Sequence, residues 1–395
     1  MEAPELLFPE MDFAWNEVPD LHALLDEARG HGTVVTVRYH DKPAYLVLGH
    51  AAVADGLSDE ERFPSPAFYT QWAEPTMGRT LQCMTGLEHR RTRSLVNAAF
   101  RPSVMKRSVE TLLAPVAHQL IDDFAGKGRV ELIDGFTHRY PATIIMRMLG
   151  LPLHDEEQVL RWALDLINYP WQPDAALRAS REFTTYLAEI VKRRRQEPND
   201  DILSELCTVE VEGERLADEE IYSLVRLLFP AGADTTFKAL GSLCWAVLTQ
   251  TDVADALAED AALRAGVVDE TLRWEPPIAL QPRAAGGRAL ADWYGAEIPA
   301  DAPMLFAIAA ANRDPEVFDA PHRFDPTRKS RNLLSFGHGE HFCLGSHLAR
   351  REMEVATQAL FARCPGVRLA APDEVEVVGA ILRGPRALQV VFDPT

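Results

Sequence analysis

Along most of the chain, apolar residues recur with the period of an α-helix. This period dominates from about residue 88 to residue 275. One long helix is predicted over residues 218–250, because Asp218, Glu219 and Glu220 open it where the helix dipole favours acids. At ~1.5 Å per residue it would extend for roughly 48 Å, enough to cross a whole domain. Pro230 and Gly232 stand in its middle, and we expect them to kink it or to open a backbone hydrogen bond.

Strand-like patterns occupy the two ends of the chain. Short apolar runs at 34–37 and 45–48 flank Asp41-Lys42-Pro43 and predict a β-hairpin. A proline-rich, irregular section is expected over about 299–331, and alternation returns over 375–392, around Gly384-Pro385. Periodicity alone therefore predicts an α-rich, mixed fold. A length prior of about 150 residues per domain suggests two or three domains. We nevertheless expect one domain over 1–395, because the motifs below must converge on one site.

Charge narrows the possible partners. With 40 basic and 59 acidic residues, the net charge of −19 disfavours nucleic acids and anionic membranes. Residues 89–107 form a basic island without acids, which suggests a site for an acidic partner; a solvated helix face is the alternative. Its basic side chains are Arg90, Arg91, Arg93, Arg101, Lys106 and Arg107.

Cysteine usage and hydropathy indicate the compartment. The five cysteines show no C-x-x-C pairing, which favours a reducing compartment without a disulfide framework. The acidic first 16 residues resemble neither a signal peptide nor an anchor, and no uncharged run approaches the ~18 residues of a membrane span. We expect a soluble, cytoplasmic monomer.

The most informative segment is the glycine-rich loop 336–345, which places Cys343 directly before a predicted helix. Ala349, Met353, Ala356 and Leu360 form the apolar stripe of that helix. The positive end of a helix dipole and its unpaired N–H groups stabilise a thiolate, and glycines let the backbone approach a flat ligand. The loop is therefore predicted to present one sulfur.

Two other readings of this cysteine were weighed. His338, His341, Cys343 and His347 could form a zinc site, since both residue types are good ligands. The spacing lacks a second cysteine pair, however, and zinc would leave the glycines unexplained. A lone cysteine is usually a small buried hydrophobe, which is the interpretation for Cys83, Cys207, Cys244 and Cys364.

The order Phe-Gly-x-Gly-x-His-x-Cys-x-Gly over 336–345 resembles the cysteine loop of the cytochrome P-450 family, the haem-thiolate monooxygenases. The resemblance implies a mainly α fold with small β-sheets and haem b (iron protoporphyrin IX) as cofactor. By the same resemblance Cys343 is the proximal iron ligand, and a cysteine thiolate favours O–O cleavage. Phe336 would pack against the porphyrin, within a loop shaped by Gly337 and Gly345, and His341 would lie near a haem propionate.

The middle of the long helix carries a second motif. Ala231-Gly232-x-Asp234-Thr235 resembles the family's oxygen-activation motif. The resemblance makes Asp234 and Thr235 the acid–alcohol pair that relays protons, beside a groove left by Ala231 and Gly232. The alternative is a bent core helix with a buried, hydrogen-bonded aspartate.

Three further motifs match the family in its order along the chain. Glu270 and Arg273 (E-x-x-R), with Arg328 of the segment 324–328, match a structural triad behind the cysteine loop. His89 and Arg93, at i and i+4, match the propionate contact H-x-x-x-R, and Arg283 matches the arginine of the following strand. Arginine suits carboxylates through its bidentate fork.

By resemblance, the chain inserts one atom of O₂ into a C–H or C=C bond of a hydrophobic small molecule. Electrons would come from an external ferredoxin and its reductase, with docking near Arg90, Arg91, Arg101, Lys106, Arg350 and Arg351. Two alternatives stay open: another haem-thiolate chemistry (peroxygenase, nitric-oxide reductase or isomerase), or a non-enzymatic haem sensor or binding module. The expected substrate pocket is lined by Phe68, Tyr69, Trp72, Met77, Phe229, Ala233, Ile278, Ala279, Leu280, Ala380 and Ile381.

Overall fold

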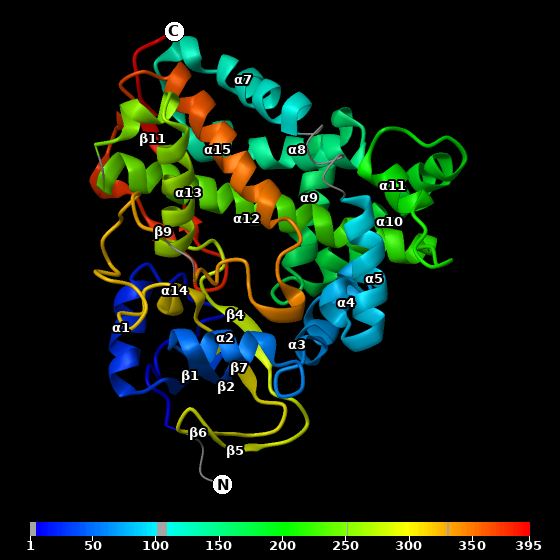
Figure 1. The fold of residues 1–395 in the computed structure, drawn as a ribbon, viewed down its shortest axis with the longest axis vertical. Helices are drawn as coiled ribbons and strands as arrows, with labels where there is room; N and C mark the ends of the chain where they lie inside the picture. The colour runs from blue at the N-terminus through cyan, green and yellow to red at the C-terminus, as the bar shows by residue number, and fades with distance from the viewer. Residues whose placement is uncertain (1–4, 101–108, 251, 330–331) are drawn as a thin grey trace.

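The computed structural model describes residues 5–100, 109–250, 252–329 and 332–395, and it divides into a helical part and a smaller β-rich part (Figure 1). The helices of the first half are α1 (Leu21–His31), α2 (His50–Ser58), α3 (Ser65–Trp72), α4 (Glu74–Met77), α5 (Gly86–Ala99), α7 (Ala114–Asp122), α8 (Arg139–Leu149), α9 (Glu156–Ile167) and α10 (Pro173–Gln196). Those of the second half are α11 (Ile202–Thr208), α12 (Asp218–Gln250), α13 (Ala261–Trp274), α14 (Ile308–Ala311) and α15 (Ser346–Arg363).

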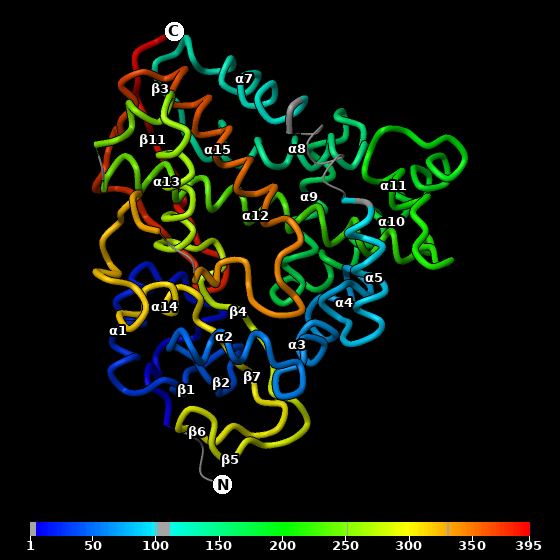
Figure 2. The backbone as a smooth tube through the Cα atoms, in the orientation of Figure 1, coloured from blue at the N-terminus to red at the C-terminus, as the bar shows by residue number. Residues whose placement is uncertain are grey.

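The predicted hairpin is confirmed as β1 (Val34–Tyr39) and β2 (Lys42–Val47), which pair antiparallel. His40 and Asp41 form the two-residue turn with φ of 52° and 60°, the positive values that a type I′ hairpin requires. This hairpin is half of a four-stranded sheet of order β1-β2-β7-β4, completed by β4 (Gln281–Ala284) and β7 (Pro303–Phe306). Segments more than two hundred residues apart thus lie side by side, the blue N-terminal part against the yellow one in Figure 2.

The remaining strands are short. β3 (Arg129–Glu131), β11 (Gln389–Val391) and β8 (Arg368–Leu369) form one sheet, whereas β9 (Val377–Val378) pairs with β10 (Gly384–Pro385) and β5 (Leu290–Trp293) with β6 (Ala296–Ile298). The strand-like tail is therefore confirmed. The irregular section expected over 299–331 is wrong at its start, which contains β7 and α14. Pairing with β2 and β4 on both sides makes β7 a strand, and a sequence window does not contain those partners.

Helix α12 runs from Asp218 to Gln250 as predicted and continues unbroken through Pro230. It crosses the helical part and contacts α8, α9, α10, α13 and α15 (Figure 1). Buried neighbours on most of its circumference hold the helix together where a proline alone would interrupt it. This placement brings its middle next to the start of α15 and the cysteine loop.

Two buried ion-pair networks lie behind that loop. Arg273 donates to both carboxylate oxygens of Glu270 at 2.7 and 2.9 Å, and Arg328 reaches Glu270 at 3.3 Å, so the predicted triad is brought together. Glu275 forms a second network with Arg383 (2.8 Å) and His22 (3.0 Å). Across the described ranges, no helix has both the length and the apolar character needed to span a bilayer.

Candidate functional site

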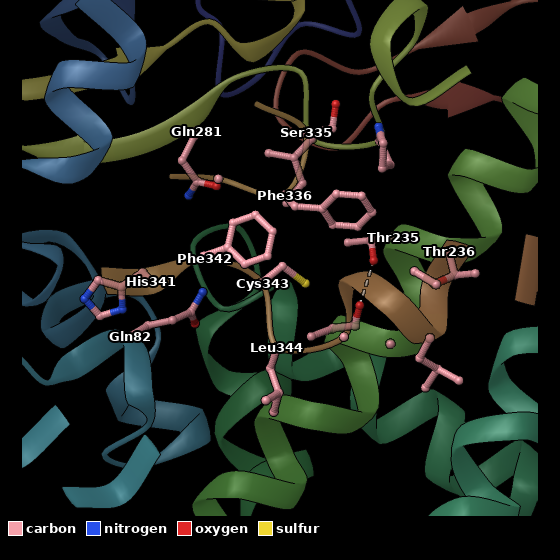
Figure 3. Close-up of a pocket in the computed structure, with 18 of the residues that line it drawn as sticks. Gln82, Thr235, Thr236, Gln281, Ser335, Phe336, His341, Phe342, Cys343 and Leu344 are labelled. Carbon is pink, nitrogen blue, oxygen red and sulfur yellow. Dashed lines mark hydrogen bonds between the residues drawn. The ribbon is translucent and has the colours of Figure 1, made fainter. Parts of the chain in front are cut away.

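A cavity of about 290 Å³ lies where α12, the cysteine loop, the start of α15, α3 and β4 meet. Figure 3 shows Cys343 with its sulfur in the cavity, between residues of the loop and Thr235 on α12. The walls combine the predicted cofactor residues with apolar side chains from α12 and β4. All residues predicted for the cofactor or for catalysis line this cavity except His89 and Asp234.

The cysteine loop is held by local geometry. Gly337 and Gly339 have φ of +73° and +76°, the left-handed region that glycine adopts without strain. A Cβ on Gly339 would lie 2.7 Å from the Cα of Ser58, so this glycine also lets the loop pack against the end of α2. The N–H of Cys343 donates to the carbonyl of Phe336 at 2.9 Å and closes the loop.

The surroundings of Cys343 differ from those of the other cysteines. Cys83, Cys207, Cys244 and Cys364 are buried, as predicted, whereas Cys343 is half-buried at the cavity. Burial raises the pKa of the Cys343 thiol, and the N–H groups of Gly345 and Ser346 offset part of that rise.

Two arginines add to this effect, because Arg93 and Arg350 also lower the pKa of the Cys343 thiol. The helix end thus favours the thiolate without producing it alone. A metal cation deprotonates a coordinating thiol outright, so this sulfur fits a site that a metal completes.

A basic rim at one end of the cavity consists of Arg93, Arg283 and His341, with His89 behind them, and several of their nitrogen atoms have no hydrogen bond in the described part of the chain. Within the described residues, His89 Nε2, His341 Nε2 and Arg283 Nε are buried without a hydrogen bond. The rings of His89 and His341 lie 4.5 Å apart, so His89 supports His341 from behind the cavity wall. Arg93 donates to the carbonyl of Phe342 at 2.8 Å. Buried nitrogen atoms without partners are rare in folded proteins, and this set fits the carboxylates of a haem.

Glutamates also approach the rim. Glu340 lies 2.9 Å from His89 Nδ1, and Glu60 lies 3.5 Å from His341 Nε2. Burial raises the pKa of Glu60, but contacts with His341 and the N–H of Ser65 outweigh it, so the net shift is downward. These acids offset part of the rim's positive charge. No three metal-ligand side chains converge within the described ranges, so the zinc interpretation gains no support there.

Helix α12 presents two different faces. Ala231, Gly232 and Thr235 line the cavity, and the Thr235 hydroxyl donates to the Ala231 carbonyl at 2.7 Å (Figure 3). A Cβ on Gly232 would meet its nearest side chain, Ile145, at 3.6 Å, an ordinary contact. Helix packing therefore does not require this glycine, and its lack of a side chain keeps the groove open.

Asp234 does not line the cavity and is buried beside Lys238 instead. It is 6% exposed, its Oδ2 has no hydrogen-bond partner within the described residues, and Lys238 stands 3.8 Å from Oδ1. Burial raises its pKa, partly opposed by Lys238 and His138. The carboxyl is thus next to Thr235 in sequence but faces the surface of α12 occupied by Lys238.

The predicted substrate pocket is corrected at most positions. Tyr69 and Ile278 line the cavity. Phe229 and Ala233 do not, because the turn of the helix points them into the core while 227, 228, 231 and 235 face the cavity. Met77 packs in that same core, and the remaining residues pack in or against the core of the β-rich part: Phe68, Trp72, Ala279, Leu280, Ala380 and Ile381.

Several cavity residues were missed by the sequence analysis. Leu227 and Leu228 could have been found by continuing the phase of α12 backwards from Thr235. Gln82, Gln281 and Ser65 carry no local signal in the sequence, because separate elements bring them to the cavity wall. The unpredicted cavity residues include Leu81, Gln82, Leu227, Leu228, Thr236, Gln281, Ser65 and Glu352. Glu352 on α15 is 4% exposed, and burial raises its pKa well above the usual range.

One arginine of the basic island is neutralised by acids from another part of the chain. Arg91 pairs with Glu220 (2.8 Å) and Glu214 (3.2 Å), so it is not the free cation that was expected. Sequence could not show this, because the two acids come from residues far along the chain. Arg350 pairs with Asp269 and lies 4.4 Å over the Phe336 ring, and Arg351 pairs with Glu354. Arg90 is exposed; Arg101 and Lys106 lie outside the described residues.

Comparisons with known proteins agree with this geometry. A family model for cytochrome P450 matches residues 156–366. 6-Deoxyerythronolide B hydroxylase of Saccharopolyspora erythraea is 32% identical, covering 95% of this chain and 96% of the relative. Cytochrome P450 monooxygenase PikC of Streptomyces venezuelae is 32% identical, covering 96% and 92%.

Solved structures give the same result. Cytochrome P450 CYP109Q5 of Chondromyces apiculatus superposes with a TM-score of 0.89 at 28% identity, over 98% of both chains. The bacillaene polyketide synthase cytochrome P450 PksS of Bacillus subtilis has a TM-score of 0.88 at 28% identity, over 95% of this chain and 97% of that one. The chain therefore belongs to the cytochrome P450 family, as a bacterial-type haem-iron enzyme that incorporates oxygen into its substrate.

Proposed function

We propose that this chain hydroxylates or epoxidises a hydrophobic small molecule of the polyketide class, with haem b as cofactor. The overall balance is RH + O₂ + 2e⁻ + 2H⁺ → ROH + H₂O for hydroxylation; epoxidation adds the same oxygen atom across a C=C bond. The observation that carries the proposal is the cavity-facing Cys343 sulfur together with the rim of unpartnered donors. Two relatives are named as a polyketide-biosynthesis cytochrome P450 and an erythromycin hydroxylase, and apolar side chains around Leu227, Leu228 and Ile278 suit such a substrate.

The cofactor roles follow from donor chemistry. Cys343 Sγ would hold the iron, and Arg93, Arg283 and His341 of the basic rim would hold the propionates through charge-assisted hydrogen bonds. His89 would keep the His341 ring in place. When bound, haem supplies oxygen activation and one-electron chemistry. Phe336, clamped by Arg350 at 4.4 Å, would support the flat ligand beside the sulfur.

Proton delivery would fall to Thr235 and Asp234. Thr235 Oγ1 donates to the Ala231 carbonyl in this structure, and rotation about its Cα–Cβ bond would turn the hydroxyl toward a ligand in the groove. Asp234 directly precedes Thr235 and lies 3.8 Å from the partly exposed Lys238, so its carboxyl would exchange protons with solvent past this lysine and replenish the hydroxyl. Burial raises the pKa of this carboxyl, which favours its protonated form and suits a group that donates protons.

The chain would receive electrons from an acidic ferredoxin. Arg90 is exposed on α5, and Arg350 and Arg351 lie in the first turns of α15, directly after the cysteine loop. We propose docking on this face, with Arg90, Arg350 and Arg351 supplying positive charge. One domain over 1–395 is also part of the proposal, because the cavity is built from residues between 57 and 353.

The axial ligand is tested by the CO-difference spectrum of the reduced protein. Wild type should show the thiolate-type band, Cys343→His should lose it, and Cys343→Ala should lose haem or activity. Cys364→Ala, which removes a buried sulfur far from the cavity, is the matched control and should keep the band. An unchanged spectrum in both Cys343 variants would refute the assignment.

Proton delivery is tested by coupling. Thr235→Ala should keep haem and NAD(P)H consumption but divert electrons to hydrogen peroxide, lowering product per NAD(P)H by up to ~10²-fold. Asp234→Asn should instead slow turnover. Tight coupling in Thr235→Ala would show that this hydroxyl does not deliver the proton.

A further inference from the structure

The cavity wall formed by α3 and β4 carries a cluster of polar groups next to Arg283 of the basic rim. Gln281, the first residue of β4, donates from Nε2 to the hydroxyl of Tyr69 on α3. Both side chains line the cavity. Nothing in the activity of a monooxygenase requires this pair, and it lies apart from Thr235, on the other side of the cavity in Figure 3, where Gln281 is labelled.

Hydrogen-bonding capacity remains after this bond is made. Among the described residues, no partner accepts from the Tyr69 O–H and none donates to the Gln281 amide oxygen. Ser65 stands one turn before Tyr69 on α3 and lines the same cavity. Its side chain is fully buried, and its hydroxyl has no partner among the described residues.

The surroundings give these groups discriminating power. Leu81, Leu227, Leu228 and Ile278 supply apolar wall in the same cavity, so few other polar groups there can satisfy a buried oxygen. In such a setting an oxygen placed between donor and acceptor binds strongly, whereas an alkyl group leaves both unsatisfied. A site that hydrogen-bonds a hydroxyl rejects the analogue without it.

The donor–acceptor pattern selects the chemical class. Tyr69 offers a proton and the Gln281 amide oxygen accepts one, so a neutral hydroxyl satisfies both at once. A carboxylate would place negative charge against the amide oxygen. Arg283, whose guanidinium lies 5.3 Å from the centre of the Tyr69 ring, belongs to the basic rim and is engaged by the cofactor in the proposed function.

We propose that Tyr69 and Gln281, flanked by Ser65, form an anchor for a substrate hydroxyl. The anchored end lies on the rim side of the cavity, and the apolar remainder of the substrate extends toward Thr235. This inference rests on the proposed function, because it places the anchor relative to a haem held by Cys343. It narrows the substrate to a hydrophobic molecule that already carries a free hydroxyl, so a reducing or hydroxylating step must precede this enzyme.

The test uses imidazole probes, whose ring nitrogen binds haem iron and shifts the optical spectrum of the holoenzyme. A series of N-alkylimidazoles of increasing chain length is compared with the matched series that ends in a hydroxyl. In wild type, at one or more lengths, the hydroxyl probe should bind about tenfold more tightly, about 1.4 kcal/mol. Tyr69→Phe and Gln281→Leu should each bring that ratio to about one, with the Kd of the methyl-ended probe changed by less than about twofold.

Tyr45→Phe is the matched control, because it deletes a tyrosine hydroxyl on β2 away from the cavity and should keep the wild-type ratio. The proposal is overturned if no chain length favours the hydroxyl in wild type, or if the preference survives in both variants. Failure of the proposed function is separate: no imidazole would then shift the spectrum, and the thiolate CO band would be missing from wild type.

Discussion

The buried polar groups behind the cavity have hydrogen-bond partners, whereas several of those along its wall have none among the described residues. Glu270 is 1% exposed and receives two bonds from Arg273, and the other donors of Arg273 reach the carbonyls of Asn312 and Pro321. Along the cavity, by contrast, the buried Arg283 Nε and Ser65 Oγ have no hydrogen bond within the described chain. Buried polar atoms in proteins are nearly always paired. The paired group around Glu270 and Arg273 therefore stabilises the fold, and the unpaired atoms of the cavity wall indicate where ligands bind.

The largest effect is expected where pairing is complete. Arg273→Ala leaves the Glu270 carboxylate buried without its main partner and should cost about 3–5 kcal/mol of unfolding free energy. Urea unfolding with circular dichroism measures it. Arg351→Ala is the control, since its exposed pair with Glu354 is worth only about 0–1 kcal/mol. Equal losses in the two variants would contradict the distinction.

The pH dependence of stability should distinguish two buried glutamates. Burial raises the pKa of Glu275, but His22, Arg383 and Arg313 outweigh it and lower the pKa to about 2. This carboxylate contributes stability above its ordinary pKa of 4.5, lost as pH falls through about 2. The shift corresponds to about 3 kcal/mol.

Glu352 behaves in the opposite way. Its raised folded-state pKa gives stability that is present at acid pH and is lost as pH rises. Unfolding free energies between pH 3 and pH 9 are compared for wild type, Glu275→Gln and Glu352→Gln. Glu275→Gln should flatten the acid limb and Glu352→Gln the alkaline limb. Burial also lowers the pKa of His22, so this residue adds its own pH dependence to the stability of every variant. Each variant is therefore compared with wild type at the same pH. Unchanged limbs would show that these carboxyls titrate normally in the folded state.

Removing an unpartnered donor should affect the cofactor more than the fold. Arg283→Met keeps the length of the side chain but deletes its donors, so haem affinity should fall about tenfold with little change in unfolding free energy. The rate of haem transfer to a scavenging globin measures the loss. Arg288→Met, at an exposed neighbouring position, is the control. Normal haem retention in Arg283→Met would remove this residue from the rim.

The smallest effect concerns electron supply. Arg90→Glu should slow reduction by an acidic ferredoxin by about threefold at low ionic strength, and added salt should reduce the difference. Arg91→Glu should change this rate less, because Glu214 and Glu220 already neutralise that arginine, although repulsion between like charges should lower stability. Equal rates in wild type and Arg90→Glu would place docking elsewhere.

The local patterns and motifs of the sequence by themselves determined several helices and strands and the cysteine loop of this protein. The hairpin over 33–48 and the helix over 218–250 follow from apolar periodicity and terminal residues, which are properties of neighbouring positions. The cysteine loop was identified because its chemistry is contiguous: glycines that permit positive φ surround one sulfur at a helix start. The Glu270–Arg273 pair was predictable for a similar reason, since i and i+3 lie on one helix face.

Only the tertiary structure decided which side chains reach the cavity. The rotation of α12 turned Phe229 and Ala233 into the core and buried Asp234 beside Lys238, away from the cavity. The partner of Tyr69 comes from a strand 212 residues later, and the acids that neutralise Arg91 come from residues 123 and 129 positions away. Local sequence fixes periodicity and backbone preference. Contacts between distant segments depend on how helices and sheets pack around a common core, and that packing is set by the whole chain at once.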